Sequence, residues 1–435
     1  MALSLGSYPP FNLGALAWLA GLPLFFLLES VHSVRFYFGL ALIYNLLYFG
    51  WLGRTNLPGW LLLSLLFALG SLPWLGLVRY GLRKNWLGLL SLFLLGAEIL
   101  RVSTDYLLPF QIVGYTQWNI SPVLQLARLG GVGLVSFFVY SVNLLLYACL
   151  KNHGAIRRYW LWLIFLAVVL LWANIPPRYS VSRKIRVALI QTNLRLTEQN
   201  LDDTELFWRT YENACLAAAA ERPDVYILPE VALPRSLRAD RDAAAQLKRL
   251  LDKLAAGIIL GNRDTDNFAL RFNNNYNAVF YIDRQGVVRG THYKQKLIPF
   301  LETANYHLPF LPYFVRNKMR AGIYRRGQDV NLLPLAPSLN VAALICYEAV
   351  SGAYLRKFTR QEPAFLVNVS SDGWSRSLTE HELNLYFNVF RAVESGRYLV
   401  RAAEDGISAV ISPRGKILAA LPAFTSGCLV YEVPF

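Results

Sequence analysis

The stretch Ala342-Ala-Leu-Ile-Cys-Tyr-Glu348 places a thiol directly after a short apolar run. An aliphatic run of this length is typical of a buried strand. The same pattern occurs upstream, where Asp224-Val-Tyr-Ile-Leu228 is followed by Pro229 and Glu230. Catalytic side chains in α/β domains often lie where strands end. Cys346 and Glu230 are therefore candidate site residues.

Residues 179–435 as a whole have the pattern of an ordinary globular domain. Short β-rich runs alternate with polar, helix-compatible segments, and this alternation predicts an α/β domain with a layered core. We expect strands near 185–190, 224–228, 256–260, 276–283, 340–345, 364–369 and 407–412. We expect helices near 197–221, 241–254 and 380–396.

Residues 1–178 have a different composition. The whole chain is 55% hydrophobic and only 16% charged, whereas soluble proteins have about 25% charged residues. The deficit lies in this first part, which consists of long apolar runs, and a membrane-spanning helix needs about 20 such residues. The sequence predicts a helical membrane domain with about six spans, near 11–29, 36–53, 59–77, 86–107, 127–150 and 159–175.

Basic residues gather in alternate loops of this part, and the chain has a formal net charge of +15. The loops concerned contain Arg35, then Arg79, Arg83 and Lys84, then Lys151, Arg157 and Arg158. Cytoplasmic loops are usually the basic ones, so we expect the domain after residue 178 to face away from the cytoplasm. No phosphate-reading motif accompanies the charge, and attraction to anionic lipid explains it better than nucleic acid.

Glu98 and Arg101 lie three residues apart within or beside the fourth predicted span. Charges inside a membrane are costly and are usually paired or functional. A mutually satisfied structural pair is the simpler interpretation, and a lipid headgroup contact is the alternative.

Neither a metal nor a cofactor is expected. The four cysteines form no Cys-x-x-Cys pair, and the five histidines are scattered without ligand spacing.

Lys294, in His292-Tyr-Lys-Gln-Lys-Leu297, completes a chemically coherent set. A thiol needs a base or cation nearby to become a nucleophile. Glu230 could take its proton, and a lysine could stabilise both the thiolate and an oxyanion. Taken singly, the three residues predict less: such a cysteine is more often a packed core residue, a Pro-Glu pair is often a turn, and a loop lysine is usually solvated.

The joint pattern resembles the nitrilase superfamily, whose triad is Glu, Lys and Cys. The matching signatures are Leu-Pro-Glu at 228–230, Tyr-Lys at 293–294 and Ile-Cys-Tyr-Glu at 345–348. With membrane spans ahead of them, these signatures resemble the apolipoprotein N-acyltransferase family in particular. The resemblance implies an α-β-β-α sandwich after the membrane domain. It also implies that Glu230, Lys294 and Cys346 are catalytic, and that Glu302, Tyr347 and Glu348 support them or bind substrate.

This resemblance also implies a reaction and its partners. Cys346 would take an acyl chain from a phospholipid as a thioester. The N-terminal amine of a diacylglyceryl-cysteine lipoprotein would then receive the chain. The enzyme would be a monomer in the bacterial inner membrane, with its catalytic domain on the periplasmic side.

Several residues depart from the family pattern, in which glycine precedes the second acidic residue. Leu301 stands at that glycine position, Glu404 and Asp405 stand where asparagine is common, and Ser375 and Arg376 replace an aromatic-glycine pair. Familiar members have one further span at each end, whereas we expect about six spans here.

Other readings therefore remain open. The chain could be another membrane-bound amidase or acyltransferase, or a catalytically silent lipoprotein-binding protein. The segment 308–314 could be a lid that dips into lipid or a packed loop.

Overall fold

The computed structural model describes residues 1–103, 108–152, 155–176, 183–194, 203–233, 235–265, 275–299, 302, 324–373, 375 and 377–435. The segment 308–314 and the departures Leu301 and Arg376 lie outside these residues. The chain forms two compact units. One joins the helices that precede residue 175 with most of helix α14 (Leu378–Ser395), and the other contains the remaining α/β elements.

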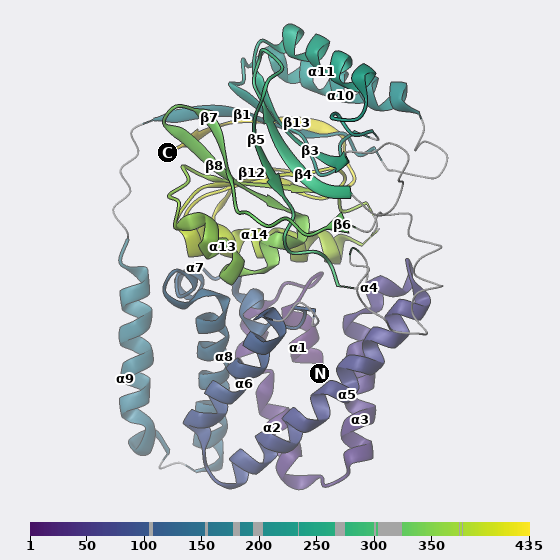
Figure 1. The fold of residues 1–435 in the computed structure, drawn as a ribbon. Helices are drawn as coiled ribbons and strands as arrows, with labels where there is room; N and C mark the ends of the chain where they lie inside the picture. Colours follow the sequence, from purple (N-terminus) through teal and green to yellow (C-terminus); the bar gives the residue numbers. More distant parts are fainter. Residues whose placement is uncertain are drawn as a thin grey trace. The chain divides into compact units, whose positions relative to one another are not determined.

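The helical unit is built from apolar helices of unequal length (Figure 1). Three helices in the described residues are long and apolar enough to cross a membrane, at Leu57–Arg83, Ala127–Lys151 and Arg157–Asn174. Three candidate spans are therefore established, while the expected number of six stays a prediction. The elements are α1 (Ala2–Ser7), η1 (Gly14–Trp18), α2 (Gly21–Ser30), α3 (Val34–Tyr48), α4 (Gly50–Gly53), α5 (Leu57–Arg83), α6 (Leu87–Ser103), η2 (Val113–Gln117), α7 (Ser121–Leu124), α8 (Ala127–Lys151) and α9 (Ala155–Asn174).

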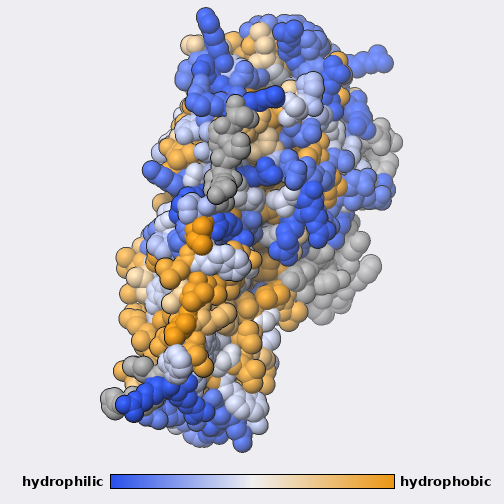
Figure 2. All heavy atoms as spheres, turned by 90° about the vertical axis from the view of Figure 1, so that its left-hand side faces the viewer, coloured by the Kyte–Doolittle hydropathy of each residue, from blue (hydrophilic) through white to orange (hydrophobic). Residues whose placement is uncertain are grey.

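The C-terminal ends of α2, α5 and α8 lie together at one end of the helical unit. Arg83 Nη2 lies 2.8 Å from His32 Nε2, and Lys151 pairs with Glu29. These contacts join the last turns of α5 and α8 to the end of α2 and the loop that follows it. Figure 2 shows hydrophobic residues along the side of these helices and hydrophilic residues at their end. The side of the membrane on which this end lies stays a prediction.

Glu98 and Arg101 of α6 both hold the segment that leads into η2. Glu98 Oε1 accepts hydrogen bonds from the Val113 N–H at 2.8 Å and from the Tyr140 hydroxyl at 2.6 Å. Arg101 Nη1 donates to the Phe110 carbonyl at 3.2 Å. Each charged side chain thus stabilises an irregular stretch of backbone among the apolar helices.

Helix α14 belongs to the helical unit although it lies late in the sequence. Tyr386 stacks on Trp118 with ring centroids 4.2 Å apart. Glu394 accepts a hydrogen bond from the Val132 N–H at 3.0 Å. Val132 follows Gly131, whose φ of +67° breaks the helical path of α8. The carboxylate of Glu394 therefore caps the helical segment that starts after this kink.

The second unit is a sandwich of two mixed sheets (Figure 1). The first has the order β13-β1-β2-β3-β4-β5, with β6 paired to β4, and the second has the order β12-β11-β10-β9-β8-β7. Strands β1, β2 and β3 are mutually parallel, as are β8, β9 and β10. The strands of the first sheet are β1 (Lys184–Gln191), β2 (Val225–Ile227), β3 (Gly257–Thr265), β4 (Asn275–Ile282), β5 (Val288–Tyr293), β6 (Tyr324–Arg325) and β13 (Gly427–Pro434). Those of the second are β7 (Leu332–Ala336), β8 (Leu339–Ile345), β9 (Leu366–Ser370), β10 (Leu399–Ala403), β11 (Ser408–Ile411) and β12 (Ile417–Leu421).

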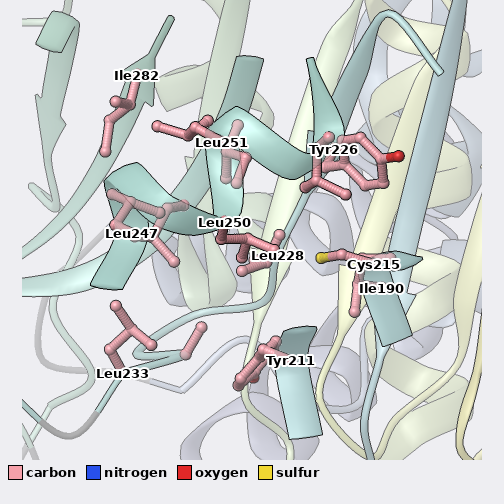
Figure 3. Packing of buried hydrophobic residues seen from close by; sticks show 14 of the residues in the cluster. Ile190, Tyr211, Cys215, Tyr226, Leu228, Leu233, Leu247, Leu250, Leu251 and Ile282 are labelled. Atoms are coloured by element: carbon pink, nitrogen blue, oxygen red, sulfur yellow. The ribbon is translucent and has the colours of Figure 1, made fainter. Parts of the chain in front are cut away.

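Two hydrophobic cores hold the sandwich together. One lies between the sheets and contains mostly Val, Ile, Leu and Ala from alternate strand positions. The other lies between the first sheet and helices α10 (Thr204–Ala219) and α11 (Arg241–Leu254). In Figure 3, Cys215 of α10 lies beside Ile190 of β1, and Tyr211 of α10 and Leu247 of α11 belong to the same cluster. Helix α13 (Gly352–Thr359) lies on the other side of the sandwich (Figure 1). The expected fold class is confirmed.

Candidate active site

Glu230 follows β2 in a turn that packs tightly on β3. A Cβ atom on Gly261 of β3 would lie 2.6 Å from the Glu230 Cα and 2.5 Å from the Pro229 carbonyl oxygen. Glycine is therefore required where the two backbones approach. Val231, next in the turn, has a left-handed φ of 51°. This backbone fixes the direction in which the Glu230 carboxylate points.

The carboxylate of Glu230 is buried and fully engaged. Its Oε1 accepts hydrogen bonds from Asn277 Nδ2 at 2.6 Å and from Lys294 Nζ at 3.1 Å. Its Oε2 accepts the Ser371 backbone N–H at 2.9 Å. Sequence reasoning did not assign a site role to Asn277 or Ser371. A single asparagine within a strand, such as Asn277 of β4, does not reveal its partner, and a backbone donor such as that of Ser371 leaves no signal in side-chain identity.

Lys294 follows β5 and has no exposed surface. Its Nζ lies between two carboxylates, 3.1 Å from Glu230 Oε1 and 2.8 Å from Glu302 Oε1. Burial alone would lower the pKa of Lys294, but Glu230, Glu302 and Cys346 raise it well above its ordinary value. The lysine is therefore a permanent cation at neutral pH.

Glu302 is held in place by its own turn. Its Oε2 accepts the Ile298 N–H at 2.7 Å, and its backbone N–H donates to the Ile298 carbonyl at 3.0 Å. Burial raises the pKa of Glu302, while Lys294 acts in the opposite direction. The contact between Glu302 and Lys294 agrees with the sequence-based expectation that they belong to one site.

Cys346 begins the 3-10 turn η3 (Cys346–Val350) directly after β8. Its φ of +47° is a left-handed conformation that side chains other than glycine rarely adopt. Burial raises the pKa of its thiol well above the ordinary value, Glu230 raises it further and Lys294 lowers it. The resting group is thus a neutral thiol, within electrostatic range of both a carboxylate and a cation.

Glu348 lies two residues after Cys346 and joins two loops of the site. Its Oε1 accepts the Gln295 N–H at 2.7 Å, and its Oε2 accepts the Ile345 N–H at 2.9 Å. His292 Nε2 lies 3.2 Å from the same Oε2. Burial alone would raise the pKa of Glu348, but His292 and the two backbone donors lower it. Glu348 therefore fixes the backbone beside Lys294 relative to the backbone before Cys346.

Tyr347 occupies the same 3-10 turn and is half-buried. Of the six residues expected from the sequence, Glu230, Glu302 and Cys346 lie around the Lys294 ammonium. Glu348 holds together the loops that carry Lys294 and Cys346. The arrangement contains a nucleophile, an acceptor for its proton and a cationic donor for an oxyanion.

Glu404 is a separate buried carboxyl, at the end of β10. It hydrogen-bonds with the hydroxyls of Thr192 and Tyr211, and its Oε1 accepts the Leu194 N–H at 2.8 Å. Burial raises the pKa of Glu404 to about 7 despite these hydrogen bonds, and nearby Asp405 acts in the same direction.

Comparison with known proteins places this site in a family. The carbon-nitrogen hydrolase family matches residues 186–435, which are more than half of the chain and include every residue of the candidate active site. The chain belongs to the carbon-nitrogen hydrolase family. Within this family, it also carries a match to the apolipoprotein N-acyltransferase N-terminal domain over residues 2–145.

Curated relatives share both parts. The apolipoprotein N-acyltransferase of Geobacter metallireducens is 28% identical, and the alignment covers 98% of this chain and 86% of that protein. Apolipoprotein N-acyltransferase 1 of Treponema pallidum is 28% identical over 75% of this chain and 66% of its own length. The family resemblance drawn from the sequence is confirmed, as is the expectation of a membrane enzyme with a nitrilase-type domain.

Among solved structures, an amidase of the nitrilase superfamily from Nesterenkonia is similar to the sandwich. It is 17% identical, with a TM-score of 0.44, over 60% of this chain and 94% of the amidase.

Proposed function

We propose that this chain transfers an acyl chain from a membrane phospholipid to the N-terminal amino group of a diacylglyceryl-cysteine lipoprotein. The observation that carries the proposal is the buried Lys294 ammonium, which lies between Glu230 and Glu302 within electrostatic range of the Cys346 thiol. The names of the curated relatives support the lipoprotein as acceptor. The apolar helices ahead of the sandwich support a lipid as donor.

In the first step, Cys346 forms a thioester. Glu230 takes the thiol proton, and the thiolate attacks the ester carbonyl of the phospholipid. The tetrahedral oxyanion is stabilised by the Lys294 ammonium, whose charge is already in place before the reaction begins. The carbon–oxygen bond then breaks, and Glu230 returns the proton to the departing alkoxide of the lysophospholipid.

In the second step, the lipoprotein amine resolves the thioester. Its nitrogen attacks the thioester carbonyl, and Glu230 accepts a proton from that nitrogen. The carbon–sulfur bond breaks, leaving an amide on the lipoprotein, and the thiolate recovers its proton. Lys294 faces a similar oxyanion in both steps, so one cation serves both half-reactions.

Trapping of the thioester tests this proposal. The purified protein in detergent is incubated with a phospholipid that carries a labelled acyl chain, without acceptor. We expect label on the Cys346 peptide that neutral hydroxylamine removes, because hydroxylamine cleaves thioesters. Addition of a diacylated lipopeptide should move the label to the peptide amine, detected as a mass increase of one acyl chain.

Two cysteine variants sharpen the test. Cys346→Ala should carry no label and make no product. Cys428→Ser, which alters a half-buried cysteine of β13, should behave as the wild type. Normal lipopeptide acylation by Cys346→Ala would disprove the mechanism. Thioester formation followed only by hydrolysis would identify an amidase-like activity instead.

The location and the assembly state belong to the same proposal. The acceptor lipoprotein and the charge distribution of the loops support a sandwich on the periplasmic side of the inner membrane. We propose a monomer, because each of the proposed catalytic groups comes from one chain.

A further inference from the structure

Ser370 lies beside the proposed nucleophile. In the parallel pair of β8 and β9, Ile345 is aligned with Val369. Cys346 and Ser370 are the next residues along the two chains, so both lie at the same edge of the sheet. The Ser370 side chain is close enough to the Cys346 thiol to lower the pKa of that thiol, against the larger effect of burial, which raises it. Ser370 itself has no exposed surface.

A second layer of polar groups fixes Ser370 from behind. Its Oγ donates to Asp372 Oδ1 at 2.7 Å, and Arg401 Nη2 donates to Asp372 Oδ2 at 2.5 Å. Arg401 also donates from Nε to the Ile407 carbonyl at 3.2 Å and from Nη1 to Asn368. These side chains are at most 1% exposed.

This layer has a specific requirement in the backbone. A Cβ atom at Gly406 would overlap Oδ2 of Asp372, so only glycine leaves room for the carboxylate there. A buried aspartate that is paired with arginine remains charged and accepts hydrogen bonds. Asp372 therefore presents a fixed acceptor to the Ser370 hydroxyl.

We propose that Ser370 is a positioning residue that serves the Cys346 sulfur in both of its protonation states. The proposal rests on the proposed role of Cys346 as nucleophile. In the resting enzyme the Ser370 hydroxyl donates to Asp372, and its lone pairs accept the thiol S–H. When Glu230 removes the thiol proton, the Ser370 hydroxyl rotates and donates to the thiolate, while Arg401 continues to neutralise Asp372.

In this proposal, three groups act on the Cys346 sulfur, each in a different way. Glu230 moves the proton, Lys294 supplies charge, and Ser370 holds the sulfur in line and stabilises its ionised form. A serine that served only to fill the core would leave the ionisation of the thiol unchanged. The pH dependence of thiol reactivity therefore distinguishes the two roles.

Alkylation of Cys346 by iodoacetamide, followed by mass spectrometry of its peptide, measures this ionisation without lipid or lipopeptide. The rate is recorded from pH 6 to pH 10 for the intact detergent-solubilised protein. For Ser370→Ala we expect the profile to move to higher pH by about one unit or more. The reason is that one hydrogen bond to a charged group corresponds to about tenfold or more in the ionisation equilibrium. The kcat for lipopeptide acylation should fall about tenfold or more, with little change in KM.

Two further variants separate this role from packing. Ser408→Ala removes another fully buried serine hydroxyl, which hydrogen-bonds only the Ala403 backbone among the described residues, and its alkylation profile should match the wild type. Ser370→Thr keeps the hydroxyl and should restore most of the wild-type profile.

The outcomes decide the proposal. A shift in Ser370→Ala that is absent from Ser408→Ala supports it. An unshifted profile in Ser370→Ala, or an equal shift in both alanine variants, overturns it. Because the readout is alkylation, failure here is distinct from failure to form the acyl thioester.

Discussion

Two regions of the sandwich bury carboxyl groups in opposite ways. Around Lys294, the buried ammonium lies within 3.1 Å of a carboxylate oxygen of both Glu230 and Glu302. At the end of β10, Glu404 has no cation among its described hydrogen-bond partners and contacts two hydroxyls and one N–H. Its pKa rises to about 7, so the carboxyl can keep its proton.

The difference shows what a buried charge requires. Removal of a charge from water is so costly that the group either pairs or becomes neutral. The first region surrounds a cation with carboxyl groups and so keeps the proposed oxyanion partner in place for chemistry. The second region lowers the cost by protonation, which makes its stability sensitive to pH.

Removal of the cation should break the first region completely. In Lys294→Met, two buried carboxylates lose their shared partner, and the oxyanion loses its donor. We expect lipopeptide acylation to fall at least about 10³-fold, and the free energy of unfolding to fall by about 3–5 kcal/mol. Product formation and thermal unfolding in detergent measure the two effects.

The matched control is Lys296→Met, two residues along the same loop, because the ion pairs with Glu230 and Glu302 are made by Lys294. It should keep most of its activity. Equal losses in the two variants would contradict the assignment of the oxyanion role to Lys294.

Glu348 is a third kind of buried carboxylate, because backbone N–H groups hydrogen-bond it where a lysine pairs with Glu230 and Glu302. Glu348→Gln replaces one acceptor oxygen by an NH₂ group, which cannot accept hydrogen bonds from backbone N–H groups. We expect kcat to fall about 10²-fold, because the loops that carry Lys294 and Cys346 lose their common anchor. The KM for the lipopeptide should change little. A variant with full kcat would show that these loops hold their positions without Glu348.

Position can be tested separately from charge. Gly261→Ala leaves every ionised group intact but places a Cβ atom against the Glu230 turn. We expect about a 10–10²-fold loss of activity from displacement of the carboxylate. Gly39→Ala in α3, where nothing lies within 4 Å of the added atom, should be active and slightly more stable. Full activity of Gly261→Ala would show that the turn adjusts.

Much of this first region could be predicted from the sequence, because its chemistry lies in residue types at strand ends. The apolar runs before Glu230 and Cys346 are strands β2 and β8, and the helix expected at 241–254 is α11, with the same bounds. The strand β5 was missed because Val288-Arg-Gly-Thr-His-Tyr293 alternates polar residues and has a glycine at its centre. It carries Lys294 at its end, so the lysine could be placed by family resemblance but not by pattern.

Contacts between residues far apart in the sequence account for the parts of the fold and of the site that could not be predicted. The final strand β13 pairs with β1, more than 200 residues earlier, and no local pattern predicts such a partner. Helix α14 was expected near 380–396, yet its stacking on Trp118 joins it to the helical unit. Glu404 was noted only as a departure from asparagine. Its pKa depends on Thr192 and Tyr211, which only the fold brings to it.

The smallest and most specific effect is expected at Glu404, through the pH dependence of stability. Folding raises the pKa of Glu404 from about 4.5 to about 7, so the folded state binds the proton more tightly than the unfolded state. The resulting stabilisation is fully present below about pH 4.5 and is lost as the pH rises through 7. Glu404→Gln resembles the protonated carboxyl at every pH. The stability of the variant relative to the wild type should therefore rise by about 2.5 kcal/mol between pH 5 and pH 8.

Thermal unfolding of the two proteins between pH 5 and pH 8 measures this difference, and other titrating groups cancel because both proteins contain them. Glu432→Gln is the opposite control. Glu432 is exposed, and its pKa is lowered by the hydrogen bond from Arg186 and by Lys184. Its contribution is lost only as the pH falls through the carboxylate range, so that difference should stay constant from pH 5 to pH 8. A constant difference for Glu404→Gln as well would mean that Glu404 keeps its charge without a cation among its described hydrogen-bond partners, and would remove the contrast between the two regions.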